Sequence, residues 1–482
     1  MRINSRMADD IESPVLSKAT FYSDLNGTSK GEISLILSIN PASVFLRASI
    51  QLLLCSFGFT EGLILQVFLD FAVLTLPLCL SVTLLSDGAL HILLTEVALS
   101  FSLLFLAIQI KSTKHKYIPL KQLGQTPMEG RLPFITNFRV LNNIGVAVGI
   151  LAVDFVVFPR RFAKTETFGT GIMDGGVGAY VLMNAIVSPE ARGQYQRSGL
   201  KPIMKSLTSS LPLLVIGLGR LVSVKGIDYH EHVSEYGLHW NFFFTLAATK
   251  ILCTLILLFT PVSWSAVISL SLAVGYQVLL TQHGLEDLVL HGTDLNDSRE
   301  GFFNANREGL VSCLGYVAIY FAGVRLGQYL LQPRKIVSEW LKVLAYLLLA
   351  DVILWITLKH VEARKGLTSR RLANLPYVIW NVAYCLHVLC GFLLIDIIMT
   401  IIRHHYLAKD KSRQLSLLVS AIGRNQLLYF LLANVLTGLV NLSIDTIHQP
   451  DVTAFGIVAL YLFVLNFVLV FFHQKNISTK FW

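Results

Sequence analysis

One short segment of the chain concentrates residue types that acid–base and electrostatic catalysis use. Asp154 lies within an apolar run. One proline and three cationic residues follow it closely: Pro159, Arg160, Arg161 and Lys164. If the run crosses a membrane, a carboxylate inside it is costly and by default a functional candidate that needs a partner. A desolvated carboxylate could take a proton from a hydroxyl group while a cation stabilises an oxyanion. Arginine could also bind a phosphate through its planar fork. The segment therefore suits acyl transfer or recognition of a phosphorylated substrate.

A structural interpretation explains the same residues. Arg160, Arg161 and Lys164 would anchor a helix end among lipid headgroups, and Asp154 would pair with one of them. Asp174 could be a helix N-cap. Glycines in the stretch that follows give small-xxx-small spacings, which favour close packing of membrane helices: Gly169, Gly171, Gly175, Gly176 and Gly178. On the pattern alone, the structural interpretation is favoured.

The elements that position these residues are predicted to be membrane helices. Of the 482 residues, 54% are hydrophobic and 14% are charged, whereas a soluble domain has about 25% charged residues. At about 20 residues per crossing, the apolar content fills about 13 transmembrane helices. We therefore predict an all-α fold, a polytopic transmembrane helical bundle. The expected crossings are about 36–58, 66–85, 90–110, 138–158, 172–187, 205–221, 240–258, 263–281, 310–330, 338–358, 377–402, 417–440 and 454–473.

Charge and cysteine content exclude other classes. The net charge of +9 is expected of a membrane protein whose basic loops face anionic headgroups, so we expect no nucleic-acid partner. The six cysteines stand within or beside apolar runs without a CxxC pair. They predict neither a disulfide framework nor a metal site.

Other polar residues fall within the apolar runs: Asp70, Glu96, Asp351, His387 and Asp396. A bundle with such residues could transport an ion or solute, which is the main alternative function, and a structural membrane subunit is a third. Transporters often show inverted repeats and paired broken helices, and the sequence shows neither.

The orientation in the membrane rests on weak signals. Lysine and arginine are nearly balanced between the two sets of alternate loops, so the positive-inside rule does not decide. The N-glycosylation sequons at Asn26 and Asn296 fall on one side of the thirteen-helix arrangement and favour a lumenal N-terminus. The sequon at Asn476 falls on the other side.

Several segments resemble the PIG-W inositol acyltransferases of glycosylphosphatidylinositol (GPI) anchor biosynthesis. The most specific match runs from Leu151 to Thr167, and it continues through Met173–Gly178 and Asn184–Ser188. Shorter matches spread in family order over most of the chain: Leu25–Thr28, Asn306–Gly309, Ser369–Tyr377 and Leu432–Asn441.

The resemblance implies an endoplasmic-reticulum enzyme with a lumenal N-terminus and a cytosolic C-terminus. It implies transfer of an acyl group, typically palmitoyl, from acyl-CoA as co-substrate to the inositol of glucosaminyl-phosphatidylinositol at the bilayer. No permanently bound cofactor or metal is expected. The implied organisation is a lumenal segment over 1–35, a multi-pass acyltransferase domain over 36–473 and a cytosolic tail over 474–482.

The resemblance also assigns site residues. The family's essential aspartate and lysine fall on Asp154 and Lys164, and either could be the base. Arg160 and Arg161 are candidates for the substrate phosphate, and Asn26 is a candidate glycosylation site. Further substrate contacts are expected at Thr165, Asp174, Arg307 and Asn374. Arg192 and Lys201 are suggested for the CoA moiety.

Overall fold

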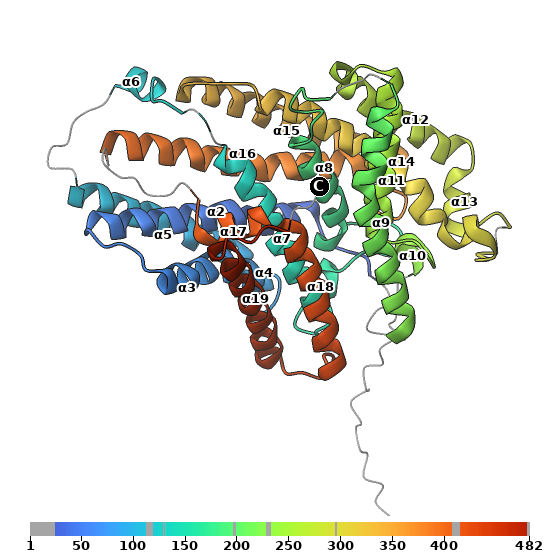
Figure 1. Cartoon of the computed structure of the whole chain (residues 1–482), viewed down its shortest axis with the longest axis horizontal. Coiled ribbons are helices and arrows are strands. Elements are labelled where there is room, and N and C mark those ends of the chain that lie inside the picture. Colours follow the sequence, from blue (N-terminus) through green and yellow to red (C-terminus); the bar gives the residue numbers. More distant parts are fainter. Residues whose placement is uncertain are drawn as a thin grey trace, which may run out of the picture.

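The computed structural model describes residues 25–111, 119–128, 130, 132–195, 199–227, 233–294, 296–406 and 415–479. Most of the predicted N-terminal segment and the last three residues of the predicted tail lie outside this part of the chain. Within it, regular secondary structure is helical, and the β-type contacts are two isolated bridges, Gly27–Thr170 and Pro127–Ile336. Figure 1 shows the arrangement.

Twelve helical segments of the described residues are long and apolar enough to cross a membrane, which confirms the all-α polytopic bundle. The first half contains α2 (Lys30–Ser56), α3 (Leu63–Leu74), α4 (Leu76–Ser81), α5 (Ala89–Lys111), α6 (Leu120–Gly124), α7 (Pro133–Ala152), α8 (Gly175–Ile186), α9 (Lys201–Ile227) and α10 (Val233–Tyr236). The second half contains α11 (Phe242–Phe259), α12 (Ser265–Gln282), α13 (Leu285–His291), α14 (Gly301–Leu330), α15 (Val337–Lys365), α16 (Leu375–Tyr406), α17 (Leu417–Arg424), α18 (Gln426–Ser443) and α19 (Asp451–Gln474). Short 3-10 turns include η2 (Arg160–Phe162) and η3 (Ile172–Asp174).

Each predicted crossing overlaps a helix, but several boundaries differ. The helix before Asp154 ends at Ala152, well before Pro159. Helix α14 starts at Gly301 instead of 310, because the polar cluster of residues 304–309 is helical, with a kink at Asn306. The predicted crossing at 172–187 corresponds to the short apolar segment Ile172–Ile186, which contains α8.

Short helix α8 lies among longer helices and contacts α7, α14 and α16. Its glycines permit this packing, as the small-residue spacing predicts. A Cβ atom at Gly178 would overlap the Asn381 side chain of α16, and one at Gly175 would lie 2.7 Å from the Tyr384 hydroxyl oxygen. The α8 backbone therefore lies directly against α16.

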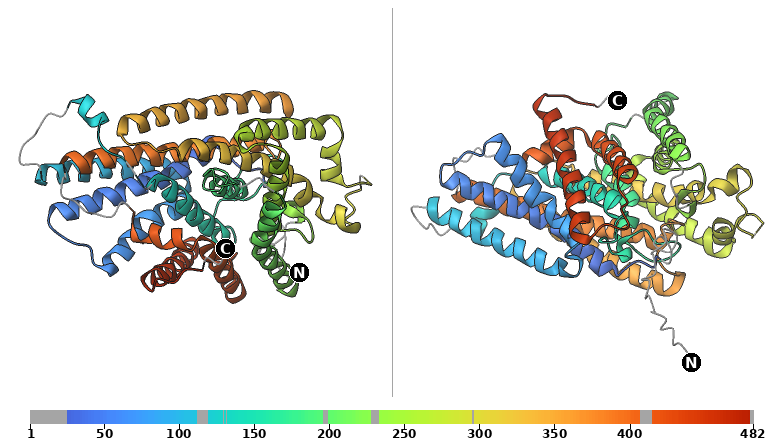
Figure 2. Two further views of the ribbon diagram at one scale, coloured as in Figure 1. Left: turned by 45° about the horizontal axis from the view of Figure 1, so that its top comes forward. Right: turned by 90° about the horizontal axis from the view of Figure 1, so that it is seen from below.

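The long helices form two groups that cross in Figure 1, where α2, α5, α15 and α16 run across the view and α9 and α11 run nearly at right angles to them. Helix α2 packs on α5 and α16, and α16 packs on α15. Both views in Figure 2 place α18 and α19 together on one side of the bundle. Helix α18 contacts α7, and this contact brings the C-terminal helices to the segment after Ala152.

The other ionisable groups within the bundle have partners in the structure. Arg47 Nε donates to Asp70 at 2.6 Å, and Ser43 donates to Glu96 at 2.9 Å. Asp396 accepts a hydrogen bond from the amide of Phe134, the second residue of α7. His387 lies 3.2 Å from both Ser38 Oγ and Asp351 Oδ2. These contacts join neighbouring helices, as buried polar groups in membrane proteins commonly do.

Candidate active site

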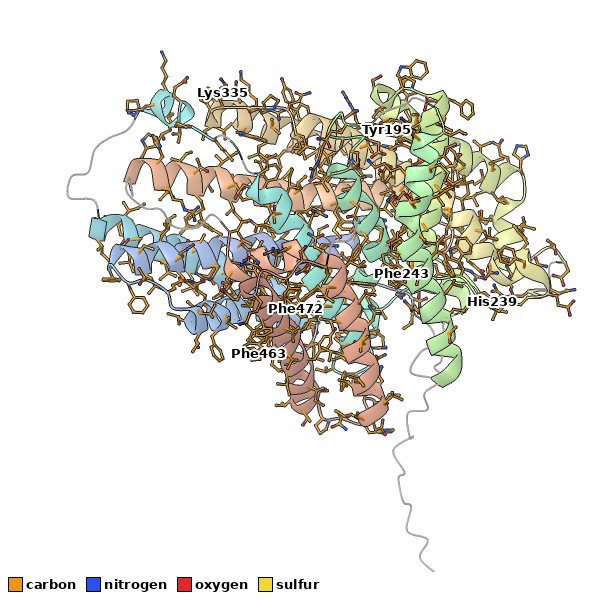
Figure 3. All side chains as sticks on the ribbon, in the orientation of Figure 1. Tyr195, His239, Phe243, Lys335, Phe463 and Phe472 are labelled. Atoms are coloured by element: carbon orange, nitrogen blue, oxygen red, sulfur yellow. The ribbon has the colours of Figure 1, made fainter. Side chains whose placement is uncertain are left out.

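A cavity of about 1460 Å³ lies where α7, α8, α9, α11 and α18 meet. Its walls are mainly apolar, with side chains such as Leu141, Phe243 (labelled in Figure 3) and Phe430. Along α7 the lining extends from Leu141 to Ile150, a rise of about 14 Å at 1.5 Å per residue, and it continues to Asp154 in the turn after the helix. The cavity exceeds the usual range of drug-sized pockets, about 300–1,000 Å³, and has room for substrates with long apolar chains.

Asp154 lines this cavity just beyond the end of α7 and is almost fully buried. Asn441 of α18 donates a hydrogen bond from Nδ2 to Asp154 Oδ2 at 2.7 Å. Burial raises the pKa of Asp154 to about 6, although the Asn441 hydrogen bond and the charges of Arg160 and Lys164 act in the opposite direction. A carboxylate with such a pKa is suited to accept a proton near neutral pH.

Arg160 holds the chain that carries Asp154. Its guanidinium donates from Nη2 to the carbonyl oxygens of Val153 at 2.7 Å and Phe158 at 3.0 Å. Because the helix has ended, these carbonyl groups lack helical partners, and the arginine supplies donors for them. Arg160 also lines the cavity, and its predicted contact with a substrate phosphate stays a prediction.

Arg161 makes its contacts outside the cavity. It donates to Glu32 at 3.1 Å and to Asp87 at 2.6 Å, and it stacks on the Phe162 ring. It is not part of the cavity wall. The structure therefore ties Arg161 to α2 and to the turn before α5, and does not bring it together with Asp154.

Lys164 lines the same cavity as Asp154 and is held by Glu235 of α10. Its Nζ donates to the two carboxylate oxygens of Glu235 at 2.8 and 2.7 Å. Arg370 lies 3.8 Å from the same carboxylate. Burial would raise the pKa of Glu235, but the charges of Lys164 and Arg370 lower it to about 2. Glu235 is therefore ionised at neutral pH, and its carboxylate holds the Lys164 side chain in place.

Asp174 is the centre of a buried group that supports the Lys164 loop. Its carboxylate accepts hydrogen bonds from Gly171 N at 2.7 Å, Arg370 Nε at 2.8 Å and Thr165 Oγ1 at 3.0 Å. It caps the backbone at Gly171, and its side chain does not cap α8. Neither Thr165 nor Asp174 lines the cavity, and their predicted substrate contacts stay predictions.

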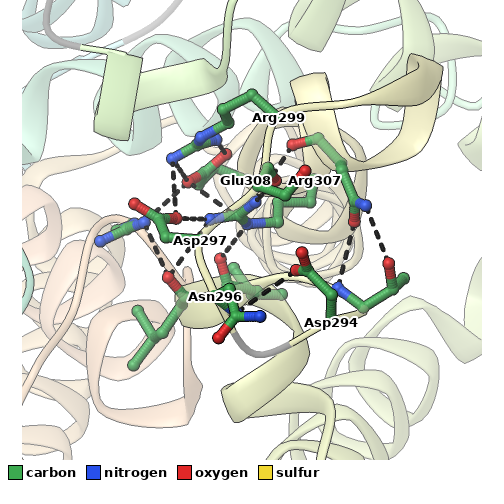
Figure 4. Close-up of polar contacts among 12 residues, drawn as sticks. Asp294, Asn296, Asp297, Arg299, Arg307 and Glu308 are labelled. Carbon is green, nitrogen blue, oxygen red and sulfur yellow. Dashed lines mark hydrogen bonds and ion pairs between the residues drawn. The ribbon is translucent and has the colours of Figure 1, made fainter.

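Arg307 and Asn374 also lie away from the cavity wall. Arg307 is fully buried and donates to the carbonyl oxygens of Val289 and Ser298, both at 2.9 Å, and to Asp297. Figure 4 shows Arg307 and its neighbour Glu308 at the centre of these contacts. The side chains of Arg307 and Glu308 therefore order the loop before α14.

Asn374 organises the start of α16. Its Oδ1 accepts from the amides of Ser369 and Tyr377, and its Nδ2 donates to the Leu367 carbonyl. For Arg307 and Asn374 alike, a substrate contact stays a prediction. The side chain of Asn26 is exposed, as a glycosylation site requires.

Sequence reasoning missed several polar residues of the cavity wall, among them Glu235, Asn441 and Arg220 of α9. Glu235 stands in a polar stretch without a recognisable spacing, and only the fold brings it to Lys164. Asn441 belongs to a segment with family resemblance, but its type and position gave no chemical signal. Arg220 lies near the end of an apolar helix, where an arginine usually indicates an interfacial anchor.

The chain is similar to known proteins over almost its whole length. A family model described as GWT1 matches residues 16–472. The glucosaminyl-phosphatidylinositol-acyltransferase PIGW of Bos taurus is 40% identical, with 96% of this chain and 99% of that protein covered. The protein of the same name from Homo sapiens is 37% identical, with the same coverage. GPI-anchored wall transfer protein 1 of Gibberella zeae is 36% identical, with 98% of this chain and 99% of that protein covered.

Proposed function

The chain belongs to the GWT1 family, and on this basis we propose that it is a glucosaminyl-phosphatidylinositol acyltransferase of GPI-anchor biosynthesis. The names of its PIGW relatives support the reaction class and the glycolipid. The observation in the structure that carries the proposal is the position of Asp154 and Lys164 on the wall of one large, mainly apolar cavity. Such a cavity can hold lipid chains while a few polar groups orient the reacting atoms.

The proposed donor is acyl-CoA, with palmitoyl as the transferred group, and the acceptor atom is an inositol hydroxyl oxygen. This oxygen forms a bond to the thioester carbonyl carbon, the carbon–sulfur bond breaks, and the CoA thiolate leaves. The hydroxyl proton passes to Asp154 and then to the departing thiolate. No acyl-enzyme is formed, so the reaction is one direct transfer.

The structure favours Asp154 over Lys164 as the base. A base must have a free lone pair, and burial gives the Asp154 carboxylate a pKa of about 6. Lys164 Nζ already donates hydrogen bonds to both carboxylate oxygens of Glu235. Lys164 is better suited to stabilise negative charge on the thioester oxygen.

The test uses microsomes that contain the protein, labelled palmitoyl-CoA and glucosaminyl-phosphatidylinositol. We expect the wild type to yield a labelled glycolipid that resists phosphatidylinositol-specific phospholipase C. Asp154→Asn and Lys164→Ala should each reduce its formation by at least about 100-fold, a loss of roughly 3 kcal/mol of transition-state stabilisation.

The matched control is Glu96→Gln, which replaces a buried carboxyl group outside the cavity wall and should retain activity. Normal rates in both active-site variants would show that the assignment is wrong. Absence of product from the wild type would contradict the proposed function itself.

We also propose that the protein resides in the endoplasmic reticulum, with its N-terminus lumenal and its C-terminus cytosolic. The contacts support a common side for Asn26 and the reacting groups, because Thr28 N donates to Thr170 O next to the Lys164 loop. Asn476 contacts Arg424, which lies just before the start of α18, whereas Asn441 lies near the end of that helix. An N-glycan on Asn26 or Asn296, removable by peptide N-glycosidase, together with an unmodified Asn476 is the expected result. A glycan on Asn476 would reverse the orientation.

A further inference from the structure

In the part of the chain that the structure describes, three lysine or arginine side chains line the cavity: Arg160, Lys164 and Arg220. Two of them are occupied by the protein. Arg160 donates to backbone carbonyl groups, and Lys164 donates to both oxygens of Glu235. Arg220 forms no hydrogen bond or ion pair with any other described residue. Its charge acts through space on Glu235 and Tyr236.

The charges around Glu235 do not balance. Lys164, Arg370 and Arg220 supply three positive charges to this group, whereas Glu235 and Asp174 supply two negative charges. Within the Asp174–Arg370 pair the two charges cancel, and the same holds for the Lys164–Glu235 pair. Among the described residues of this group, Arg220 is the cation without a paired carboxylate, and it is on the cavity wall.

The fold fixes Arg220 in this position. Ile216 and Arg220 are one helical turn apart on α9, and both face the cavity. Asn241, at the start of α11, donates to the carbonyl oxygen of Gly217 at 2.9 Å and so ties α9 to the cavity wall. Arg220 also lies close to the end of the membrane-spanning part of α9, where an anionic lipid headgroup can reach it.

We propose that Arg220 binds a phosphate group of a substrate during the acyl transfer. This inference rests on the proposed function, which supplies two substrates with phosphate groups: the phosphodiester of the glycolipid acceptor and the phosphates of the CoA donor. Among the described residues, Arg220 has no paired carboxylate, and it lies on the wall of a mainly apolar cavity. The planar fork of an arginine can donate two hydrogen bonds to a phosphate, and its charge can neutralise the single negative charge of a phosphodiester. Arg160 and Arg161, which the sequence suggests for this role, are engaged by the protein.

The test measures steady-state kinetics of the full-length protein in detergent micelles, with the acceptor and the donor varied separately. The variants are Arg220→Gln, Arg220→Lys and Lys205→Gln. Lys205→Gln is the matched control, because it removes one positive charge from an exposed position on the same helix, about 22 Å from Arg220.

Arg220→Gln should raise the KM for one substrate by about 10- to 100-fold, because a charged hydrogen bond to phosphate is lost. Arg220→Lys should recover part of the loss, and Lys205→Gln should leave both KM values unchanged. An increase confined to the glycolipid identifies the acceptor phosphodiester, and an increase confined to acyl-CoA identifies the donor.

A neutral acceptor separates charge recognition from general damage. In this acceptor the phosphodiester is methylated to an uncharged triester. If Arg220 binds the acceptor phosphate, Arg220→Gln should have little further effect with the triester. If it binds the donor, the effect should persist with the triester and stay confined to the KM for acyl-CoA.

Unchanged KM values for both substrates, in an Arg220→Gln protein with wild-type thermal stability, would overturn the inference. If that variant does not fold, a KM for Arg220→Lys equal to the wild-type value with both substrates would overturn it as well. In either case the wild type would still form product, so the proposed function would stand. Absence of product from the wild type would instead remove the proposed function.

Discussion

At the residue scale, the site depends on how few charged groups its cavity contains and on what each of them contacts. Asp154 is buried against Asn441, and Lys164 is paired with Glu235. The carboxylate with a pKa near neutrality is Asp154, whereas Glu235 has a pKa of about 2. The two carboxylates therefore have separate roles: one can exchange a proton near pH 6, and the other keeps a cation in place.

Activity should fall as the pH drops through about 6, because a base with a raised pKa becomes protonated there. The sign follows from the role: Asp154 must be ionised to accept a proton, so kcat/KM rises with pH and levels off above the pKa. Glu235 cannot cause this limb, since its pKa is about 2. A pH profile of kcat/KM in detergent checks the expectation. The relevant range is pH 5 to 7, on the order of one pH unit either side of the expected pKa. A flat profile over this range would argue against Asp154 as the base.

Asn441→Leu should move this acidic limb to higher pH by about one pH unit, because the hydrogen bond from Asn441 stabilises the ionised carboxylate. The measurement is the same pH profile. Asn434→Leu is the matched control: Asn434 also lines the cavity, but its Nδ2 donates to the Phe430 carbonyl of its own helix. If the acidic limb moved equally in both variants, Asn441 would have no specific effect on the proton transfer.

At the element scale, short helix α8 determines how closely the helices approach around the cavity. Its glycines remove the side chains that would separate α8 from α16. One turn of α8, from Gly175 to Gly178, contacts Tyr384 and Asn381, while Gly176 faces the cavity. The same helix therefore serves as a packing surface on one face and as a cavity wall on another.

Gly178→Ala should destabilise the protein by roughly 1–3 kcal/mol, because the added methyl group overlaps the Asn381 side chain. The measurement is the thermal unfolding temperature in detergent. Gly176→Ala is the control on the same helix, since its new Cβ would lie 4.0 Å from a methyl group of Val146, an ordinary van der Waals distance. Equal stability of the two variants would show that α8 and α16 can separate at little cost.

The elements were predicted from sequence more completely than the site. Runs of about 20 apolar residues predict membrane helices because the bilayer requires them, and each predicted crossing overlaps a helix. Asp154 and Lys164 were found because the segment resembles a family, and ionisable residues are rare in apolar runs. Glu235, Asn441 and Arg220 come from three different helices. Periodicity does not reveal which helices meet, so their convergence on one cavity needed the three-dimensional structure.

At the scale of the whole molecule, loops that are distant in sequence close one end of the bundle. Gly169 N donates to Thr368 O at 2.9 Å, and Glu166 N donates to Leu25 O. The buried Asp174–Arg370 pair joins the same loops at their centre. The loop that carries Lys164 therefore depends on the start of the described chain and on the loop before α16.

Asp174→Ala should destabilise the fold by about 3–5 kcal/mol, because it leaves the buried guanidinium of Arg370 without its closest partner. The unfolding temperature should fall clearly, while Asp287→Ala, at an exposed position, should leave it nearly unchanged. A stable Asp174→Ala protein with a raised KM for the glycolipid would instead favour the substrate contact that the sequence predicts for Asp174.

The cavity wall has a consequence for biosynthesis of the protein. Leu25 and Asn441 both belong to it, and Leu25 is synthesised long before Asn441. While α18 is still inside the ribosome, the Asp154 carboxylate has no Asn441 to donate to it, and one side of the cavity is open to lipid. The early helices must therefore be kept in the membrane in an incomplete state until the last helices insert, and chains that stop before α18 expose an unfinished polar site to quality control.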